Sequence, residues 1–159
     1  RYAQGDLQGA IANYEHAMRL NPNDPMLYYN RGNARRDSND LQGALADYNR
    51  ALELRPTFAE ALVNRGRVWR DQGNLAAAIA DFSRAIELNP NDAKAFGNRG
   101  LARFEQRDFV GAKDDIERAI QLDPTDAEPY SARGTLRYAH EPTGLAKLGK
   151  SGRSARAVW

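Results

Sequence analysis

The 159-residue sequence contains no cysteine, and this absence excludes two kinds of site at once. Neither disulfides nor thiolate metal ligands are available. Cysteine usage therefore does not indicate whether the protein works in an oxidising or a reducing compartment. The sequence also lacks any apolar run near the roughly 18 residues that a membrane-spanning helix needs. Its start, RYAQGDLQGA, contains no apolar core of a signal peptide. We therefore expect a soluble protein without a membrane partner, and a cytoplasmic location is favoured.

Histidine is scarce as well, and its two copies form no catalytic pattern. His16 is expected on a helix and His140 at the start of a tail, and neither has a matching nucleophile or metal ligand. No strand is predicted, and the sequence contains no glycine-rich phosphate-binding loop of the kind that follows a strand. The sequence therefore predicts no enzyme activity, no catalytic residues, no cofactor and no metal site.

Net charge is small, and its distribution argues against nucleic acid as a partner. The formal charge is +2 and the pI is about 9.0. From Glu141 onward, four basic residues stand against one acid, whereas residues 1–140 hold 19 basic and 20 acidic groups. A nucleic-acid-binding domain concentrates basic residues on one face. The near-neutral main part of the chain therefore disfavours RNA binding.

A repeat of 34 residues dominates the sequence. Residues 59–90 read AEALVNRGRVWRDQGNLAAAIADFSRAIELNP, and shifts by 34 residues place similar segments at 25–56 and 93–124. Copies in strict register predict a stacked array of helical units. We divide the chain into a partial repeat with an intact second helix (1–24), three repeats (25–58, 59–92 and 93–126), a partial repeat or capping helix (127–141) and a basic tail (142–159).

Each full unit is expected to form two helices, because cap residues recur and apolar residues follow a 3.6-residue period. Asp24 stands before Pro25, which is typical of an N-cap and a first helical position. A left-handed residue is expected to end the first helix at Gly73, and Asn39 and Arg107 take the same place in the neighbouring units. The second helices are expected to be capped by Asp40, Asn74 and Asp108.

Glycine and arginine recur side by side in the first helices. Glycine inside a helix costs about 1 kcal/mol relative to alanine, so its recurrence predicts a facing helix that leaves no room for a Cβ. An arginine precedes each glycine, and an aspartate recurs on the second helices. A guanidinium can hold a carboxylate bidentately, so an Arg–Asp network joining the paired helices is favoured over a phosphate- or acid-binding stripe. The residues are Gly32, Gly66, Gly100 and Gly134; Arg31, Arg65, Arg99 and Arg133; and Asp47, Asp81 and Asp115.

The unit resembles the tetratricopeptide repeat over residues 1 to about 138. The resemblance rests on the 34-residue period, on an aromatic or apolar residue near the front (Tyr28, Leu62, Phe96, Tyr130), and on the glycine, alanine, aromatic, alanine and proline that follow. The Asn-Arg-Gly triplets at 30–32, 64–66 and 98–100 depart from the family, where an apolar residue is usual in place of arginine. The resemblance implies an all-α fold, a right-handed α-solenoid of antiparallel helix pairs, and a non-catalytic protein-interaction scaffold.

One face of the first helices is the candidate binding surface. Positions 2, 5, 9 and 12 of each unit share this face, and solenoids bind partners on their concave side. We therefore predict a protein or peptide partner in a concave groove rather than a bare solvated face. Tyr29, Leu101, Phe104 and Tyr138 are expected to be exposed there. The candidate residues are Tyr29, Asn33, Arg36, Val63, Asn64, Arg67, Arg70, Lys94, Asn98, Leu101 and Phe104.

Co-chaperone members of the family clamp a C-terminal carboxylate with Lys and Asn, then Asn, then Lys and Arg. Asn33, Asn64 and Lys94 stand at matching positions, but Tyr29 and Asn98 replace the first Lys and the Arg. The match is therefore incomplete. A peptide with an acidic group or a C-terminal carboxylate is the broader expectation, held near Arg67, Arg70 and Lys94.

Two further expectations concern the ends of the array. The chain begins inside a first helix, which indicates a fragment of a longer array. The repeats are alternatively the recruiting arm of a larger enzyme, for example of glycosyltransferase type, with its catalytic domain absent from this chain. Exposed apolar surface seeks a partner, so self-association is expected through the N-terminal edge formed by Leu7, Ala10, Ile11, Tyr14 and Ala17.

Overall fold

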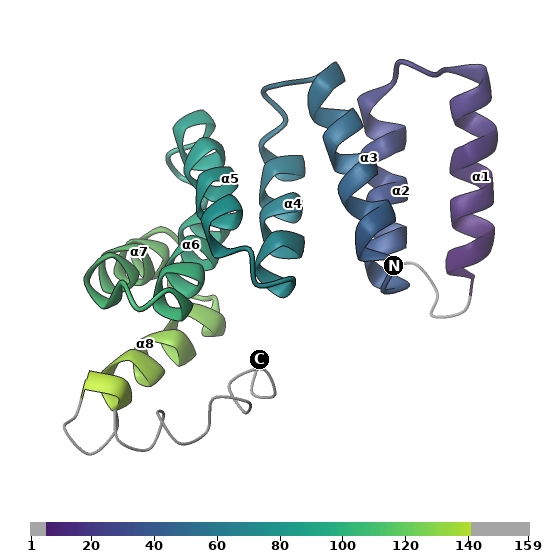
Figure 1. Ribbon diagram of the computed structural model, residues 1–159. Coiled ribbons are helices and arrows are strands. Elements are labelled where there is room, and N and C mark those ends of the chain that lie inside the picture. The colour runs from purple at the N-terminus through teal and green to yellow at the C-terminus, as the bar shows by residue number, and fades with distance from the viewer. Residues whose placement is uncertain (1–5, 141–159) are drawn as a thin grey trace.

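The computed structural model describes residues 6–140, and within that range the chain forms eight α-helices and no strand (Figure 1). The basic tail assigned to residues 142–159 lies outside the described residues. None of the described helices is long and apolar enough to cross a membrane. The helices are α1 (Leu7–Leu20), α2 (Pro25–Asp37), α3 (Leu41–Leu54), α4 (Ala59–Asp71), α5 (Leu75–Leu88), α6 (Ala93–Glu105), α7 (Phe109–Leu122) and α8 (Ala127–His140).

The predicted cap residues begin the helices. The Asp24 carboxylate accepts a hydrogen bond from Met26 N at 2.9 Å, with Pro25 as the first residue of α2. Helix α4 is different, because Phe58 precedes it and supplies no side-chain cap. Side-chain oxygens also accept hydrogen bonds from backbone N–H groups at the starts of α3, α5, α6 and α7. The accepting residues are Asp40, Asn74, Asp92 and Asp108.

The turn inside each full unit contains one residue with a positive φ. The φ angle is 64° at Asn39, 79° at Gly73 and 69° at Arg107. The sequence placed left-handed residues at these three positions, and this prediction is confirmed. Such a conformation is comfortable for glycine and strained for arginine.

The helices stack into a bent array in which each unit contacts its neighbours. Within a unit, α2 packs on α3, α4 on α5, and α6 on α7; between units, α3 packs on α4 and α5 on α6. The first helices also contact one another, α2 with α4, α4 with α6 and α6 with α8. First helices therefore form one layer and second helices the other, and the predicted all-α repeat solenoid is confirmed (Figure 1).

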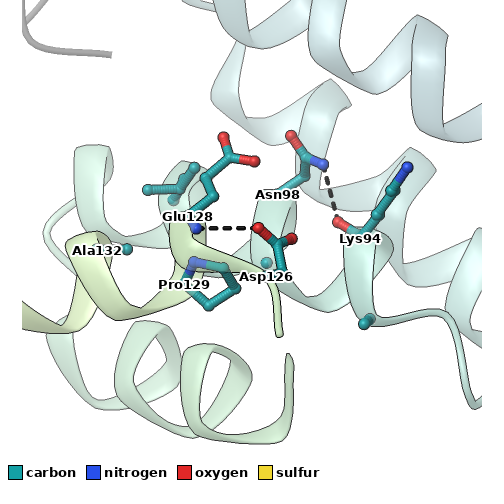
Figure 2. Close-up of a pocket in the computed structure, with 9 residues that line it drawn as sticks. Lys94, Asn98, Asp126, Glu128, Pro129 and Ala132 are labelled. Atoms are coloured by element: carbon teal, nitrogen blue, oxygen red, sulfur yellow. Dashed lines mark hydrogen bonds between the residues drawn. The ribbon is translucent and has the colours of Figure 1, made fainter. Parts of the chain in front are cut away.

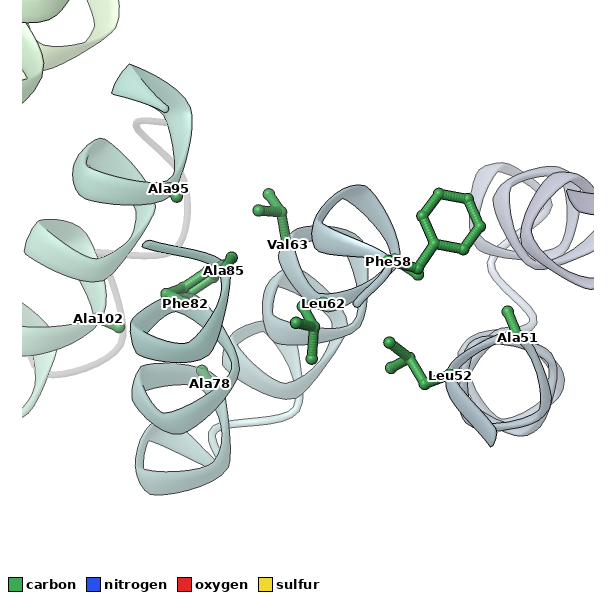
Figure 3. Close-up of a cluster of buried hydrophobic side chains, with 11 residues drawn as sticks. Ala51, Leu52, Phe58, Leu62, Val63, Ala78, Phe82, Ala85, Ala95 and Ala102 are labelled. Atoms are coloured by element: carbon green, nitrogen blue, oxygen red, sulfur yellow. The ribbon is translucent and has the colours of Figure 1, made fainter. Parts of the chain in front are cut away.

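The core runs along the seam between the two layers. Tyr48, Phe82 and Ile116 are fully buried, one on each second helix of the full units. Alanines at 0% exposure stand around them and allow the helices to approach closely. Figure 3 shows the central cluster, where Phe82 of α5 and Leu62 of α4 lie among side chains from α3 to α6.

The glycine prediction is confirmed in the three full units and stays untested at Gly134. A Cβ on Gly32, Gly66 or Gly100 would come within 3 Å of the large side chain of the paired helix. No heavy atom of the described residues lies within 4 Å of the Cβ position of Gly134. The residues that the repeat register places opposite Gly134, 143–156, lie outside the described residues.

Candidate functional site

Arginine–aspartate pairs join the two helices of each full unit. Arg31 donates from Nε and Nη2 to the two carboxylate oxygens of Asp47, at 2.9 and 2.6 Å. Asp47 is 3% exposed, so the bond lies inside the fold. This hydrogen bond raises the pKa of Arg31. The same bidentate geometry, with distances of 2.6–2.8 Å, joins Arg65 to Asp81 and Arg99 to Asp115.

The same arginines reach the second helix of the preceding unit. Their Nη1 atoms contact an oxygen 16 residues earlier in the chain. Their donors are therefore used within the protein, which supports the structural interpretation of the arginine stripe. Sequence reasoning missed this second contact because the acceptor changes type along the array. The pairs are Arg31 with Glu15 at 3.4 Å, Arg65 with Asn49 at 2.7 Å, and Arg99 with Ser83 at 3.1 Å.

A polar network lies between α2 and α4 and brings three predicted site residues together. Asn64 Nδ2 donates to Tyr29 Oη at 3.1 Å and to Asn33 Oδ1 at 2.9 Å. Tyr48 Oη donates to the same Asn33 oxygen at 2.8 Å. Burial raises the pKa of Tyr48 well above its usual value, so the hydroxyl keeps its proton. The network fixes the orientation of the Asn33 and Asn64 side chains.

Hydrogen-bond donors outnumber acceptors around this network. Asn33 is engaged through its carbonyl oxygen only, so no described residue accepts from its Nδ2. Arg36 bonds Asp37 Oδ1 through Nε at 3.2 Å and Nη2 at 2.9 Å, while its Nη1 is buried without a partner. Arg67 is exposed and forms no ion pair with another described residue. The surface between α2 and α4 therefore favours a ligand rich in acceptor oxygens.

The predicted residues on α4 and α6 are partly engaged with one another. Arg70 Nη1 lies 3.5 Å from Asn98 Oδ1, and its Nε lies 3.8 Å from Glu105 Oε1. Asn98 Nδ2 donates to the Lys94 carbonyl of its own helix at 2.8 Å. Lys94 itself is exposed. Arg70 thus links two first helices and is less available to a ligand than Arg67.

A small hollow lies further along the same layer, between α6 and α8 (Figure 2). Its walls include Lys94 and Asn98 from α6 and Glu128 and Pro129 from α8. Its volume of about 10 Å³ suits one water molecule. The described residues contain no group of three histidine, aspartate or glutamate side chains that could hold a metal ion. The predicted site residues thus span two separate polar regions of the first-helix layer.

The expected exposed apolar face is wrong for Leu101. This residue is 7% exposed and packs with Ala132 and Leu136 of α8. Val63 is similarly buried at 9% in the central cluster. The cause is the contact between successive first helices, which covers residues that a single helical wheel leaves open. Tyr29 and Phe104 are half-buried, whereas Tyr138 is 51% exposed as expected.

Comparison with known families accounts for the repeat. A tetratricopeptide repeat model matches residues 29–93 and 63–127, and a TPR repeat model matches residues 1–35. The chain belongs to the tetratricopeptide repeat family. Tetratricopeptide domains are generally non-catalytic interaction modules, so the family supports a protein-interaction scaffold. No curated protein matches the chain.

Solved structures share the solenoid. The Arabidopsis OM64 TPR domain is 24% identical with a TM-score of 0.70, and the match covers 71% of this chain and 93% of that one. MamA from Desulfovibrio magneticus RS-1 is 23% identical with a TM-score of 0.80, covering 98% and 89%. The first TPR of Spaghetti (RPAP3), bound to the HSP90 peptide SRMEEVD, is 25% identical with a TM-score of 0.68, covering 79% and 94%.

Proposed function

We propose that this tetratricopeptide chain is a non-catalytic scaffold that binds an extended peptide in a concave groove formed by its first helices. The observation that carries the proposal is the surplus of hydrogen-bond donors between α2 and α4. An extended peptide offers a carbonyl oxygen at every residue and matches such a surface. The Asn33 amide and the Tyr29 hydroxyl are the donors for these carbonyls.

The proposed ligand also carries a carboxylate. Arg67 is exposed without an ion pair among the described residues, whereas Arg36 Nη1, also without an acceptor, is buried and is reached only if the Arg36 side chain moves. Hydrogen bonds to charged groups are worth about 1.5–3 kcal/mol, so one carboxylate near these guanidinium groups would contribute much of the affinity. The RPAP3 domain supports a peptide of this kind, since the peptide in its structure, SRMEEVD, is acidic.

The carboxylate site that we propose differs from the co-chaperone clamp. Tyr29 stands in place of the first clamp lysine, and its ring packs on Phe58 at a centroid distance of 4.8 Å. Asn98 stands in place of the clamp arginine and donates to its own helix. We therefore place the carboxylate beside Arg67, one turn from the incomplete clamp, with Arg70 and Lys94 as flanking cations.

Selection of peptides against the intact chain tests the proposal. Random twelve-residue peptides are displayed on phage, and the selected sequences are synthesised and titrated by fluorescence anisotropy. We expect the selected peptides to contain acidic residues, and we expect Asn64→Ala and Arg67→Ala each to weaken binding roughly tenfold or more. Arg84→Ala is the matched control, because Arg84 is exposed on α5 and pairs only with Glu87 among the described residues.

Circular dichroism checks that every variant keeps its helices. Equal affinity of the selected peptides for Arg67→Ala, Asn64→Ala and the unaltered chain would remove the α2–α4 surface as the binding site. A recruiting arm of a larger enzyme stays the alternative. The full-length reading frame decides it, since the absence of a catalytic domain on both sides would end that idea.

Self-association through α1 is a separate prediction that the contacts of the chain leave untested. The residues of the predicted edge, Leu7, Ala10, Ile11, Tyr14 and Ala17, are partly buried. Leu20, at the end of α1, was not among them but is 77% exposed, and exposed apolar surface favours association. Sedimentation equilibrium over a hundredfold range of concentration measures it. A monomer at every concentration would contradict the prediction.

A further inference from the structure

A groove of about 560 Å³ lies between α7 and α8, away from the proposed peptide site between α2 and α4. Its apolar part comprises Phe109, Val110, Ile116 and Leu136. Val110 is 73% exposed, and among the large apolar residues of the described range only Leu20 has a larger exposed fraction. Charged groups surround the apolar part, namely Lys113, Asp114, Glu117, Arg133 and Arg137.

The earlier units show what such a groove holds. Helix α6 receives α7, and Asp115 of α7 accepts from both Arg99 and Arg103 of α6, at distances between 2.7 and 2.9 Å. A shift of 34 residues places Arg133 and Arg137 at the same positions on α8. Neither arginine forms an ion pair with another residue of the described range. Helix α8 therefore presents two arginines that could bind a carboxylate, and no described residue provides that carboxylate.

Gly134 presents the matching apolar site. In the three full units the equivalent glycine lies against a large side chain, and Gly100 meets Ile116 Cγ1 at 2.8 Å from its Cβ position. In the part of the chain that the structure describes, nothing lies within 4 Å of the Cβ position of Gly134. The two arginines and this glycine lie on the same face of α8, at the spacing that α6 uses to bind α7.

The chain's own continuation does not match this surface. In register, residue 149 is Gly where the other units have aspartate, and Lys150 replaces the large apolar residue. Arg153 stands where the other units have a buried alanine. Two further cations beside Arg133 and Arg137 would repel rather than pair. Residues 143–156 therefore lack the pattern of a second helix that would fill this groove in register.

We propose that the α7–α8 groove binds an amphipathic helix of a partner protein, which completes the fifth unit. The recognition pattern follows from the three internal second helices, which all read Ala-x-x-Asp, then a large apolar residue, then x-x-Ala. The aspartate would pair with Arg133 and Arg137, and the large apolar residue would lie against Gly134. This inference is independent of the peptide site between α2 and α4.

A helix taken from the chain itself is the probe. The peptide contains residues 74–89, NLAAAIADFSRAIELN, labelled and blocked at both ends. Short helices are marginal in water, so Ala76→Lys and Ala80→Glu are joined by a lactam bridge to hold the helix. Both positions are exposed in the chain and leave the binding face unchanged. Binding to the intact protein is followed by fluorescence anisotropy.

We expect saturable binding that weakens at least tenfold when the peptide carries Asp81→Asn or Phe82→Ala. On the protein, Gly134→Leu fills the apolar site and should abolish binding, and Arg133→Ala with Arg137→Ala should weaken it at least tenfold. Gly134→Leu replaces glycine in a helix and should not unfold α8. Arg84→Ala is the control and should bind the probe normally, because Arg84 is exposed on α5 and belongs to neither proposed site.

Three results would overturn the inference. The first is no binding of the bridged peptide to the intact chain. The second is binding that Gly134→Leu leaves unchanged, because the peptide would then dock elsewhere. The third is self-association of the chain alone that Gly134→Leu abolishes, because the occupant would then be a second copy.

Discussion

The backbone of Gly66 lies against the ring of Phe82, so that a Cβ on Gly66 would stand 2.7 Å from Phe82 Cε1. Gly66→Ala must push a fully buried ring aside, and overpacking of this kind costs about 1–3 kcal/mol. Gly134→Ala meets no atom of residues 6–140 and should gain up to about 1 kcal/mol of helix propensity. Urea unfolding of the two variants should therefore shift in opposite directions. Equal shifts would show that the space above Gly134 is filled.

The buried aspartates differ in the number of arginines from which they accept hydrogen bonds. Asp115 accepts from Arg99 and Arg103, whereas Asp81 accepts from Arg65 alone because Trp69 stands at the second position. Removing one partner of a buried ion pair leaves an uncompensated charge and costs up to about 3–5 kcal/mol. We expect Asp115→Asn to lower the unfolding free energy more than Asp81→Asn, by about 1 kcal/mol. Chemical denaturation of both variants measures the difference, and the reverse order would contradict the double contact.

Arg107 ends α6 with a φ of 69°, a conformation that L side chains adopt at a cost. The residue is exposed, so its replacement removes no buried contact. Arg107→Gly should raise the unfolding free energy by about 1 kcal/mol. Gly73→Ala at the equivalent turn, where φ is 79°, should lower it by a similar amount. Thermal unfolding compares the pair, and a gain from Gly73→Ala would show that the turn relaxes.

The raised pKa of Tyr48 makes stability sensitive to alkaline pH. Burial is the main cause, and the folded-state pKa lies above the unfolded value of about 10. The contribution of Tyr48 is therefore complete below about pH 10 and is lost as the pH rises further. Tyr48→Phe removes the hydrogen bond to Asn33 at neutral pH but should flatten the decline above about pH 10. Tyr138→Phe, at an exposed position, is the control and should leave the slope unchanged.

The fold could be predicted from the sequence because each helix signal recurs at the same place in every unit. Asp24 with Pro25, and Gly73, stand where local chemistry favours them, and the repeat register places Asn39 and Arg107 at the same turn position. The pairing of Arg31 with Asp47 also followed from recurrence, since an arginine and an aspartate kept one spacing throughout.

The candidate site was less predictable because it depends on contacts between units. Leu101 falls on the outer face of its own helix, and only the approach of α8 buries it. The contact of Arg65 with Asn49 left no sequence signal, because asparagine recurs in no other unit at that position. The orientation of the Asn33 amide depends on hydrogen bonds that join α2, α3 and α4, so the residues next to Asn33 in the sequence do not determine it.

The recurring arginine that forms hydrogen bonds to the second helices of two successive units also couples the unfolding of those units. Arg65 holds Asp81 of its own unit and Asn49 of the preceding one, so melting either unit breaks a bond of the other. In repeat proteins such nearest-neighbour terms decide whether units unfold singly or together. We expect the three full units to melt as one block, with exchange of backbone amide hydrogens fastest in α8, whose arginine has no aspartate among the described residues.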